Sequence, residues 1–187
     1  MSIIKIAVDL DGTLADIHSY WIDKLYRGKF TLEDITDWST WPNGITTSQF
    51  IEESDELWKN DWGHIPMVEI GHYERSDFYW MLAFLVDKYQ IDIVTGRQIN
   101  RKIINRWLHT HGIVFDNIIQ TKGSDTKYEL DYTYFVDDYP YLWMGLKDGQ
   151  QHILFDRPWN QHIGPEKKLF RVNNLESAFQ HISRRED

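Results

Sequence analysis

The amino-acid sequence predicts an α/β protein with a mainly parallel β-sheet, flanked by helices and interrupted by one helical insertion. Short β-branched apolar runs alternate along the chain with segments whose apolar residues repeat every three or four positions. The stretch 16–73 breaks this alternation, because it contains helical patterns and no convincing strand. Strands that alternate with helices form βαβ units, and such units build parallel sheets covered by helices.

Each expected strand is a short run rich in Ile, Val or aromatic residues. The expected strands are residues 3–8, 91–94, 117–121 and 132–136, with weaker edge candidates at 152–155 and 169–172. Three of these runs stop at polar residues, namely Asp9, Thr95 and Asp137. The carboxyl ends of parallel strands lie along one edge of a sheet, so we expect these side chains to converge.

Helical periodicity predicts helices at residues 16–26, 46–59, 78–86, 99–108 and from 174 onward. Thr46 and Gln49 have the spacing of a capping box, and Gly112 follows a helical pattern where a C-terminal cap is expected. We therefore expect an α/β core formed by residues 1–15 and 74–187. A small helical cap, residues 16–73, is inserted after the first strand.

The composition excludes several classes of protein. The chain has 187 residues, no cysteine and a formal charge of −9, and nine of its residues are tryptophan. Without cysteine there is no disulfide scaffold, thiolate metal site or thiol nucleophile. The acidic balance disfavours binding to a nucleic acid, and no apolar run is long enough to span a membrane. The N-terminal residues do not have the pattern of a signal peptide, so we expect a cytoplasmic protein.

Acidic residues cluster at the expected strand ends. Asp9 and Asp11 follow the first strand, and Asp137 and Asp138 follow the fourth. Carboxylates that converge in this way repel one another unless a cation lies between them. Oxygen ligands favour a hard ion, so we expect Mg²⁺ with coordination positions left for water and a substrate phosphate.

The residue types at these strand ends suit phosphoryl transfer. Asp9 can attack phosphorus as a nucleophile, and Asp11 can protonate the leaving oxygen and then activate water. Gly12 permits a sharp turn directly after them. Thr95 can donate a hydrogen bond to a phosphoryl oxygen, and a lysine is needed to offset the growing negative charge.

Four motifs in this order resemble those of the haloacid dehalogenase superfamily. They are Asp9–Thr13, a strand ending in Thr95, a lysine near 122–127 and a strand ending in Asp137 and Asp138. The likeness covers residues 3–140 and is most similar to the 5'(3')-deoxyribonucleotidase branch. It implies a Rossmann-like core and a Mg²⁺-dependent phosphatase that works through a phospho-aspartate.

The resemblance also implies a role for individual residues. Asp9 corresponds to the nucleophile, Asp11 to the acid/base with its backbone carbonyl on the metal, and Thr95 to a phosphoryl ligand. Metal ligands are expected among Asp9, Asp11, Asp137 and Asp138, and the inner-sphere member of the last pair stays open. For the lysine, Lys127 is favoured because it lies ten residues before Asp137, and Lys122 is the alternative.

One motif departs from the branch. A small residue and then proline usually follow the threonine, whereas here the sequence is Thr95-Gly96-Arg97. We group Gly96 and Arg97 with the substrate-binding residues. Arg97 either reaches a substrate phosphate or begins the next helix and faces solvent.

Tryptophan is concentrated in the insertion, at positions 21, 38, 41, 58 and 62. The resembling branch holds the base against aromatic side chains of such a cap, and stacking on a ring tolerates different bases. Trp62 and the nearby His64 occupy the part of the cap where that branch contacts its substrate, so we predict both as substrate contacts. His18, on the first insertion helix, is expected more often to be structural than to face the pocket.

The sequence therefore predicts a phosphomonoesterase that hydrolyses (deoxy)nucleoside 5'-monophosphates through an aspartyl-phosphate intermediate. Alternatives are the same chemistry on a sugar phosphate or a nucleic-acid 3'-phosphate end, and a non-catalytic nucleotide-binding protein. Dehalogenation is disfavoured, because Asp11 and the second acidic pair serve phosphoryl transfer. The partner is expected to be a small phosphate ester, not a nucleic acid or membrane. Monomer versus homodimer, the base, the sugar and the phosphate position stay open.

Overall fold

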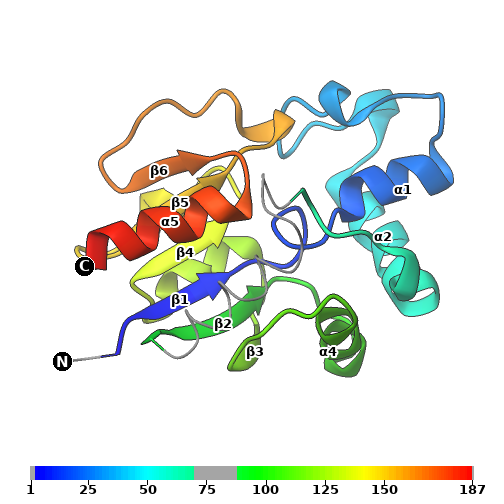
Figure 1. The fold of residues 1–187 in the computed structure, drawn as a ribbon. Coiled ribbons are helices and arrows are strands. Elements are labelled where there is room, and N and C mark those ends of the chain that lie inside the picture. Colours follow the sequence, from blue (N-terminus) through cyan, green and yellow to red (C-terminus); the bar gives the residue numbers. More distant parts are fainter. Residues whose placement is uncertain (1–2, 70–87, 187) are drawn as a thin grey trace.

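The computed structural model describes residues 3–69 and 88–186 of the chain. Its centre is a six-stranded parallel sheet with the strand order β3-β2-β1-β4-β5-β6 (Figure 1). Every strand lies within two residues of a run predicted from the sequence, so the predicted fold class is confirmed. The strands are β1 (Lys5–Val8), β2 (Gln90–Thr95), β3 (Asn117–Gln120), β4 (Tyr134–Asp137), β5 (Gln151–Phe155) and β6 (Leu169–Val172).

The strand order reverses at β1, which pairs with β2 on one side and β4 on the other. Val8 lies opposite Ile93 in β2 and Val136 in β4, so these three strands end at nearly the same level. In doubly wound sheets, the crevice outside the carboxyl ends at such a reversal is where ligands bind. The topology therefore places the candidate site beyond the end of β1.

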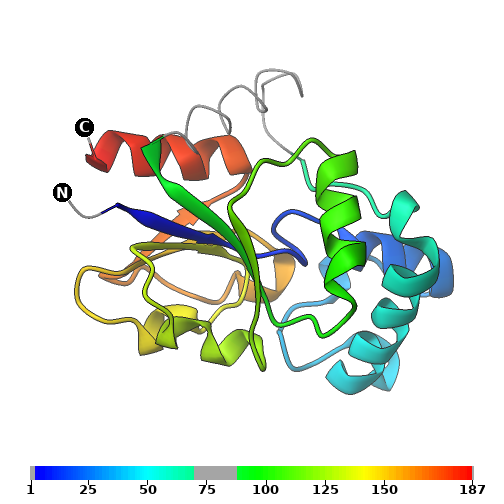
Figure 2. The ribbon, with the colours of Figure 1, turned by 90° about the horizontal axis from the view of Figure 1, so that it is seen from below.

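The two faces of the sheet are covered differently. On one face lies α5 (Leu175–Glu186), and on the other lie the short 3₁₀ turns Ser124–Glu129 and Leu142–Gly145 (Figure 2). A strand covered on both faces needs apolar side chains on both. In β1, Ile6 and Val8 belong to one of the two buried hydrophobic clusters, and Ala7 between them belongs to the other.

The insertion forms a helical layer beyond the carboxyl ends of the strands, with α1 (Ile17–Leu25) and α2 (Thr47–Asp61) (Figure 1). The hydroxyl of Thr46 caps α2 by accepting a hydrogen bond from the backbone N–H of Gln49, 3.1 Å away. Aromatic rings join the two helices of this layer: the ring of Trp21 on α1 packs edge-on against that of Phe50 on α2, with centroids 5.1 Å apart. Both insertion helices lie where the sequence predicts them.

The helix α4 (Arg101–Thr110) follows β2, and Gly112 ends it with a positive φ of 67°. The helix predicted at residues 78–86 and the boundary predicted between residues 73 and 74 lie outside the described residues. Within the described part of the chain, no helix combines the length and the apolar character needed to cross a membrane.

Candidate active site

Three carboxylates meet where β1 and β4 end side by side. The ladder continues one residue past β1, because the backbone N–H of Asp9 donates to the carbonyl of Val136 at 2.9 Å. This contact brings Asp9 next to Asp137 and Asp138, and one carboxylate oxygen from each of the three lies within 4.8 Å of the others. All three side chains are buried. The arrangement is the convergence that the strand ends predict.

Lys127 is the cation inside this carboxylate cluster. Its Nζ lies 2.7 Å from Asp9 Oδ1 and 2.7 Å from Asp137 Oδ2, and the side chain is only 1% exposed. Burial alone would lower the pKa of Lys127, but attraction to Asp137 and Asp9 outweighs burial and raises it above its ordinary value. Of the two lysines proposed from the sequence, Lys127 is the one bonded to the carboxylates. Lys122 instead lines the neighbouring cavity.

The single positive charge of Lys127 does not neutralise the negative charges of three carboxylates. Burial, followed by repulsion from Asp137, raises the pKa of Asp9 to about 7. Burial and the carboxylates of Asp9 and Asp137 raise the pKa of Asp138 well above its ordinary range. A divalent cation among such groups reverses this effect by favouring their charged forms.

Asp137 and Asp138 differ in their partners. Asp137 Oδ2 accepts from Lys127, and Asp137 Oδ1 accepts from the backbone N–H of Tyr139 at 2.8 Å. Neither oxygen of Asp138 has a hydrogen-bond partner among the described residues, although the side chain is fully buried. Buried carboxylate oxygens without partners are costly, and a bound cation would satisfy them. The donor set of the cluster therefore fits a hard divalent ion.

Gly12 makes room for this arrangement. It has a φ of +80°, and a Cβ atom at this position would lie 2.2 Å from Asp138 Oδ2. Both the backbone conformation and the close approach of Asp138 thus require glycine. Arg157 supports the same turn, because its Nε donates to the carbonyl of Gly12 at 2.6 Å.

The side chain of Asp11 lies outside the carboxylate cluster. Its Oδ1 accepts a hydrogen bond from Trp58 Nε1 at 2.9 Å, and its Oδ2 accepts one from Arg97 Nε at 2.8 Å. Both carboxylate oxygens of Asp11 thus have partners outside the carboxylate cluster. The expected metal ligand of Asp11 is its backbone carbonyl, and that stays a prediction. Arg97 is buried, which contradicts the alternative that it faces solvent, and its guanidinium is paired with Asp11 and Asp55. A contact between Arg97 and a substrate phosphate stays a prediction.

A cavity of about 380 Å³ opens from Asp9 and Asp11 toward the insertion. On the core side it is lined by Thr95, Gly96 and Arg97 together with Lys122. Thr95 is buried, and its hydroxyl accepts a hydrogen bond from the backbone N–H of Arg97 at 3.0 Å. The cavity therefore joins the predicted nucleophile to the predicted phosphate-binding residues.

The aromatic wall of the cavity differs from the one predicted. It comprises residues from the insertion and from the loop after β4: His18, Trp38, Trp41, Phe50 and Tyr139. Trp62 and His64, predicted as substrate contacts, are not among the lining residues. His64 is largely exposed and pairs with Asp61 at 2.6 Å.

The register of α2 explains this difference. Phe50, Ile51 and Asp55 lie on the helix face that lines the cavity, whereas Trp62 and His64 follow the last residue of the helix. Helical spacing in the sequence indicates that residues 50, 51, 54, 57 and 58 share a face of this helix, and only part of that face lines the cavity.

His18 also lies in the cavity wall, against the expectation of a purely structural role. Its ring is stacked on that of Phe50, with centroids 4.7 Å apart, and neither ring nitrogen has a partner among the described residues. Burial, followed by the nearby Arg157 and Arg97, holds the pKa of His18 well below its ordinary value. The imidazole is therefore neutral and able to donate or accept a hydrogen bond.

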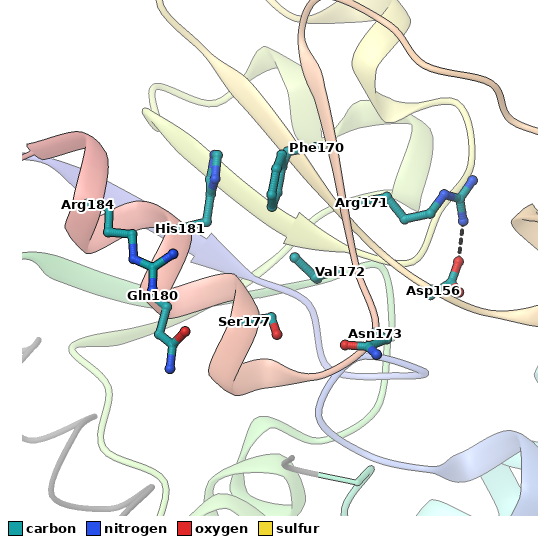
Figure 3. Close-up of a pocket in the computed structure, with 9 residues that line it drawn as sticks. All are labelled: Asp156, Phe170, Arg171, Val172, Asn173, Ser177, Gln180, His181 and Arg184. Carbon is teal, nitrogen blue, oxygen red and sulfur yellow. Dashed lines mark hydrogen bonds and ion pairs between the residues drawn. The ribbon is translucent and has the colours of Figure 1, made fainter. Parts of the chain in front are cut away.

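A second hollow lies at the edge of the sheet, between β6 and α5 (Figure 3). Phe170 stacks on His181 there with ring centroids 3.6 Å apart, and Arg171 is paired with Asp156. Asp156 is the one carboxylate among the described residues that line the hollow, and it is already paired with Arg171. The cavity beyond β1 is therefore the candidate active site.

The sheet order, the carboxylate cluster and the inserted helices together define the haloacid dehalogenase-like fold. Among solved structures, a haloacid dehalogenase-like family hydrolase from Streptococcus pneumoniae matches with a TM-score of 0.58 and 15% identity, over 96% of this chain and 98% of that chain. L-2-haloacid dehalogenase from Xanthobacter autotrophicus, with chloropropionic acid covalently bound, matches with a TM-score of 0.57 and 12% identity. This match covers 97% of this chain and 99% of that chain. No protein-family model matches the sequence, and no curated protein matches it. At these identities the likeness establishes the fold.

Proposed function

We propose that this chain is a Mg²⁺-dependent phosphomonoesterase that hydrolyses (deoxy)nucleoside 5'-monophosphates through an aspartyl-phosphate intermediate. The observation that carries the proposal is the buried cluster of Asp9, Asp137 and Asp138 around Lys127, with Asp11 beside it. A nucleophilic carboxylate, a buried cation and an adjacent second carboxyl are the parts that phosphoryl transfer needs.

The first step forms the intermediate. A carboxylate oxygen of Asp9 attacks phosphorus, and the bond from phosphorus to the ester oxygen breaks with its electron pair on that oxygen. The carboxyl group of Asp11 gives its proton to the departing oxygen, so the nucleoside leaves as an alcohol. Lys127 and the hydroxyl of Thr95 offset the charge on the phosphoryl oxygens.

The second step restores the enzyme. Water attacks phosphorus, the bond between phosphorus and Asp9 breaks, and the proton of the water passes to the carboxylate of Asp11. Inorganic phosphate leaves, Asp9 is again a carboxylate, and Asp11 is again protonated. The two steps together consume one water and release one alcohol and one phosphate.

The residues that would hold Mg²⁺ are Asp9 and Asp138. Asp138 is preferred over Asp137 because its two oxygens have no hydrogen-bond partner in the described parts of the chain, whereas both oxygens of Asp137 are bonded. When bound, the ion would supply Lewis-acid stabilisation of the phosphoryl oxygens and allow the carboxylates to stay charged side by side.

The aromatic wall supports a nucleotide over a bare sugar phosphate. Trp41 and Phe50 present stacked rings to the cavity, and stacking of a base on such a ring contributes about 1–3 kcal/mol. The neutral imidazole of His18 offers a hydrogen bond to the substrate within the same wall. Dehalogenation, the activity named for one protein of this fold, needs neither the proton from Asp11 nor a metal at Asp138.

The test is a substrate panel with and without EDTA. It includes nucleoside 5'- and 3'-monophosphates with ribose and deoxyribose, ribose 5-phosphate, a 3'-phosphorylated oligonucleotide and 2-chloropropionate. We expect phosphate release from the nucleoside 5'-monophosphates, loss of activity in EDTA and recovery with Mg²⁺. The Asp9→Asn variant should fold and be inactive. Full activity of that variant, or halide release without phosphatase activity, would refute the proposal.

A further inference from the structure

The cap and the core meet at the side chain of Asp11. Trp58 on the cap helix α2 donates to Asp11 Oδ1, and Arg97 at the end of β2 donates to Asp11 Oδ2. Each carboxylate oxygen has more than one lone-pair site, so a carboxyl group held in this way can still exchange a proton with a substrate. The two donors therefore hold both oxygens of the carboxyl group.

Trp58 is fixed where it makes this hydrogen bond. The side chain is fully buried, and its ring packs edge-on against Trp107 of α4, with centroids 5.7 Å apart and planes at 72°. Trp107 in turn donates from Nε1 to the backbone carbonyl of Ile65 at 2.9 Å. Trp58 does not line the cavity, and its indole N–H joins it to the site through the hydrogen bond to Asp11.

Arg97 is tied to the cap as well. Its Nη1 lies 2.8 Å from the hydroxyl of Ser54 and 2.5 Å from Asp55 Oδ1, and both partners are on α2. Asp11 and Asp55 share the positive charge of Arg97, so the guanidinium bridges the core to the cap helix. One turn of α2 thus supplies the indole N–H and also anchors the guanidinium.

We propose that Trp58 and Arg97 are positioning residues for the acid/base Asp11, so that docking of α2 on the core completes proton transfer to the leaving group. This inference rests on the proposed function, because it assumes that Asp11 protonates the leaving oxygen. Proton donation matters most for a strongly basic leaving group such as a ribose alkoxide. Nitrophenolate is a weak base and departs without a proton.

The experiment compares Trp58→Phe with Asp11→Asn and the wild type on two substrates, a nucleoside 5'-monophosphate and 4-nitrophenyl phosphate. The quantity compared is the rate of leaving-group release in the first turnover, because the second step uses Asp11 with both substrates. Phenylalanine keeps an aromatic ring beside Trp107 and removes only the N–H donor. The matched control is Trp21→Phe. Trp21 is also fully buried in the cap and also donates from Nε1 to a carboxylate, that of Glu53 at 2.8 Å, but it does not contact Asp11.

For Trp58→Phe we expect the first-turnover rate of nucleoside release to fall about tenfold or more, within the about 10²–10⁴-fold that general acid–base catalysis supplies, with the half-saturating nucleotide concentration little changed. The first-turnover rate of nitrophenolate release should change far less, and Trp21→Phe should keep both rates. An equal loss on both substrates, or no loss on the nucleotide, would overturn the positioning role.

The Asp11→Asn variant separates the two hypotheses. If it loses the nucleotide reaction selectively while Trp58→Phe does not, the acid role of Asp11 stands and the positioning role is wrong. If Asp11→Asn shows no selectivity, the acid role itself fails, and the inference fails with it.

A measurement without turnover covers the case in which Trp58→Phe does not fold. The indole N–H resonances of the wild-type protein are assigned by NMR and compared with those of Asp11→Asn. The Trp58 resonance should move strongly because its acceptor changes from a carboxylate to an amide, and the Trp21 resonance should not. An unmoved Trp58 resonance would contradict the proposed hydrogen bond in solution.

Discussion

Replacement of Asp138 by asparagine should stabilise the metal-free protein while removing its response to Mg²⁺. The three carboxylates lie within 4.8 Å of one another, and two unit charges at that distance repel by about 3.5 kcal/mol at an effective dielectric constant of 20. Asp138 interacts with both Asp9 and Asp137, although Arg157, Lys127 and proton uptake relieve much of the repulsion. We therefore expect a net gain of about 1–3 kcal/mol in the free energy of unfolding.

Thermal unfolding in EDTA and in Mg²⁺ measures this effect. For a chain of this size the gain corresponds to a rise in Tm on the order of 5 °C in EDTA. Mg²⁺ should raise the Tm of the wild type, because a ligand that binds the folded state stabilises it. In Asp138→Asn the ion should have little effect, and phosphatase activity should be lost.

The matched control is Asp92→Asn, the same substitution at a buried aspartate whose carboxylate is fully hydrogen-bonded. Asp92 accepts hydrogen bonds from Tyr132, Gln90 and Asn117. Loss of its charge should therefore destabilise the protein by about 1–3 kcal/mol and leave the Mg²⁺ response intact. The reasoning is wrong if Asp138→Asn is less stable than the wild type in EDTA, or if Mg²⁺ stabilises it as strongly as the wild type.

Three further predictions concern the same cavity. In EDTA, the free energy of unfolding of the wild type minus that of Asp9→Asn, measured with urea, should fall as pH rises from about 4 to about 7, because folding keeps on Asp9 a proton that the unfolded chain releases. The subtraction removes the opposite contributions of the buried His18 and His152, whose pKa values burial lowers, and a flat or rising difference would contradict the reasoning. Lys127→Met should lower the free energy of unfolding by about 3–5 kcal/mol, since it breaks a buried ion pair; an unchanged urea midpoint would count against the pairing. Trp41→Leu should raise KM for nucleotides by roughly tenfold through lost stacking, with Trp62→Leu as the control that keeps KM unchanged.

Much of the fold and part of the site follow from local sequence. The strands and the insertion helices are readable because apolar periodicity is a property of neighbouring residues. The meeting of Asp9 with Asp137 was also predictable, since parallel strands place their carboxyl ends at one edge. The position of a site residue can be predicted best where the residue directly follows a buried strand.

The lysine and the aromatic wall were harder to predict. Lys122 and Lys127 lie in one short connection, and only the fold of the 3₁₀ turn Ser124–Glu129 shows that Lys127 is the buried one. Trp62 was chosen by its place in the chain, whereas the rotation of α2 places Phe50 in the cavity and Trp58 against Asp11. Helical spacing states which residues share a face, but it does not state what that face covers.

The parallel sheet, the helical insertion and the acidic strand ends follow from the sequence, because each depends on residues a few positions apart. The tertiary structure was needed to show that the oxygens of Asp138 have no hydrogen-bond partner among the described residues, that Arg97 bridges Asp11 to the cap, and that Trp58 donates to Asp11. These relations join residues tens of positions apart. Their geometry depends on how whole elements pack, and no local pattern encodes that.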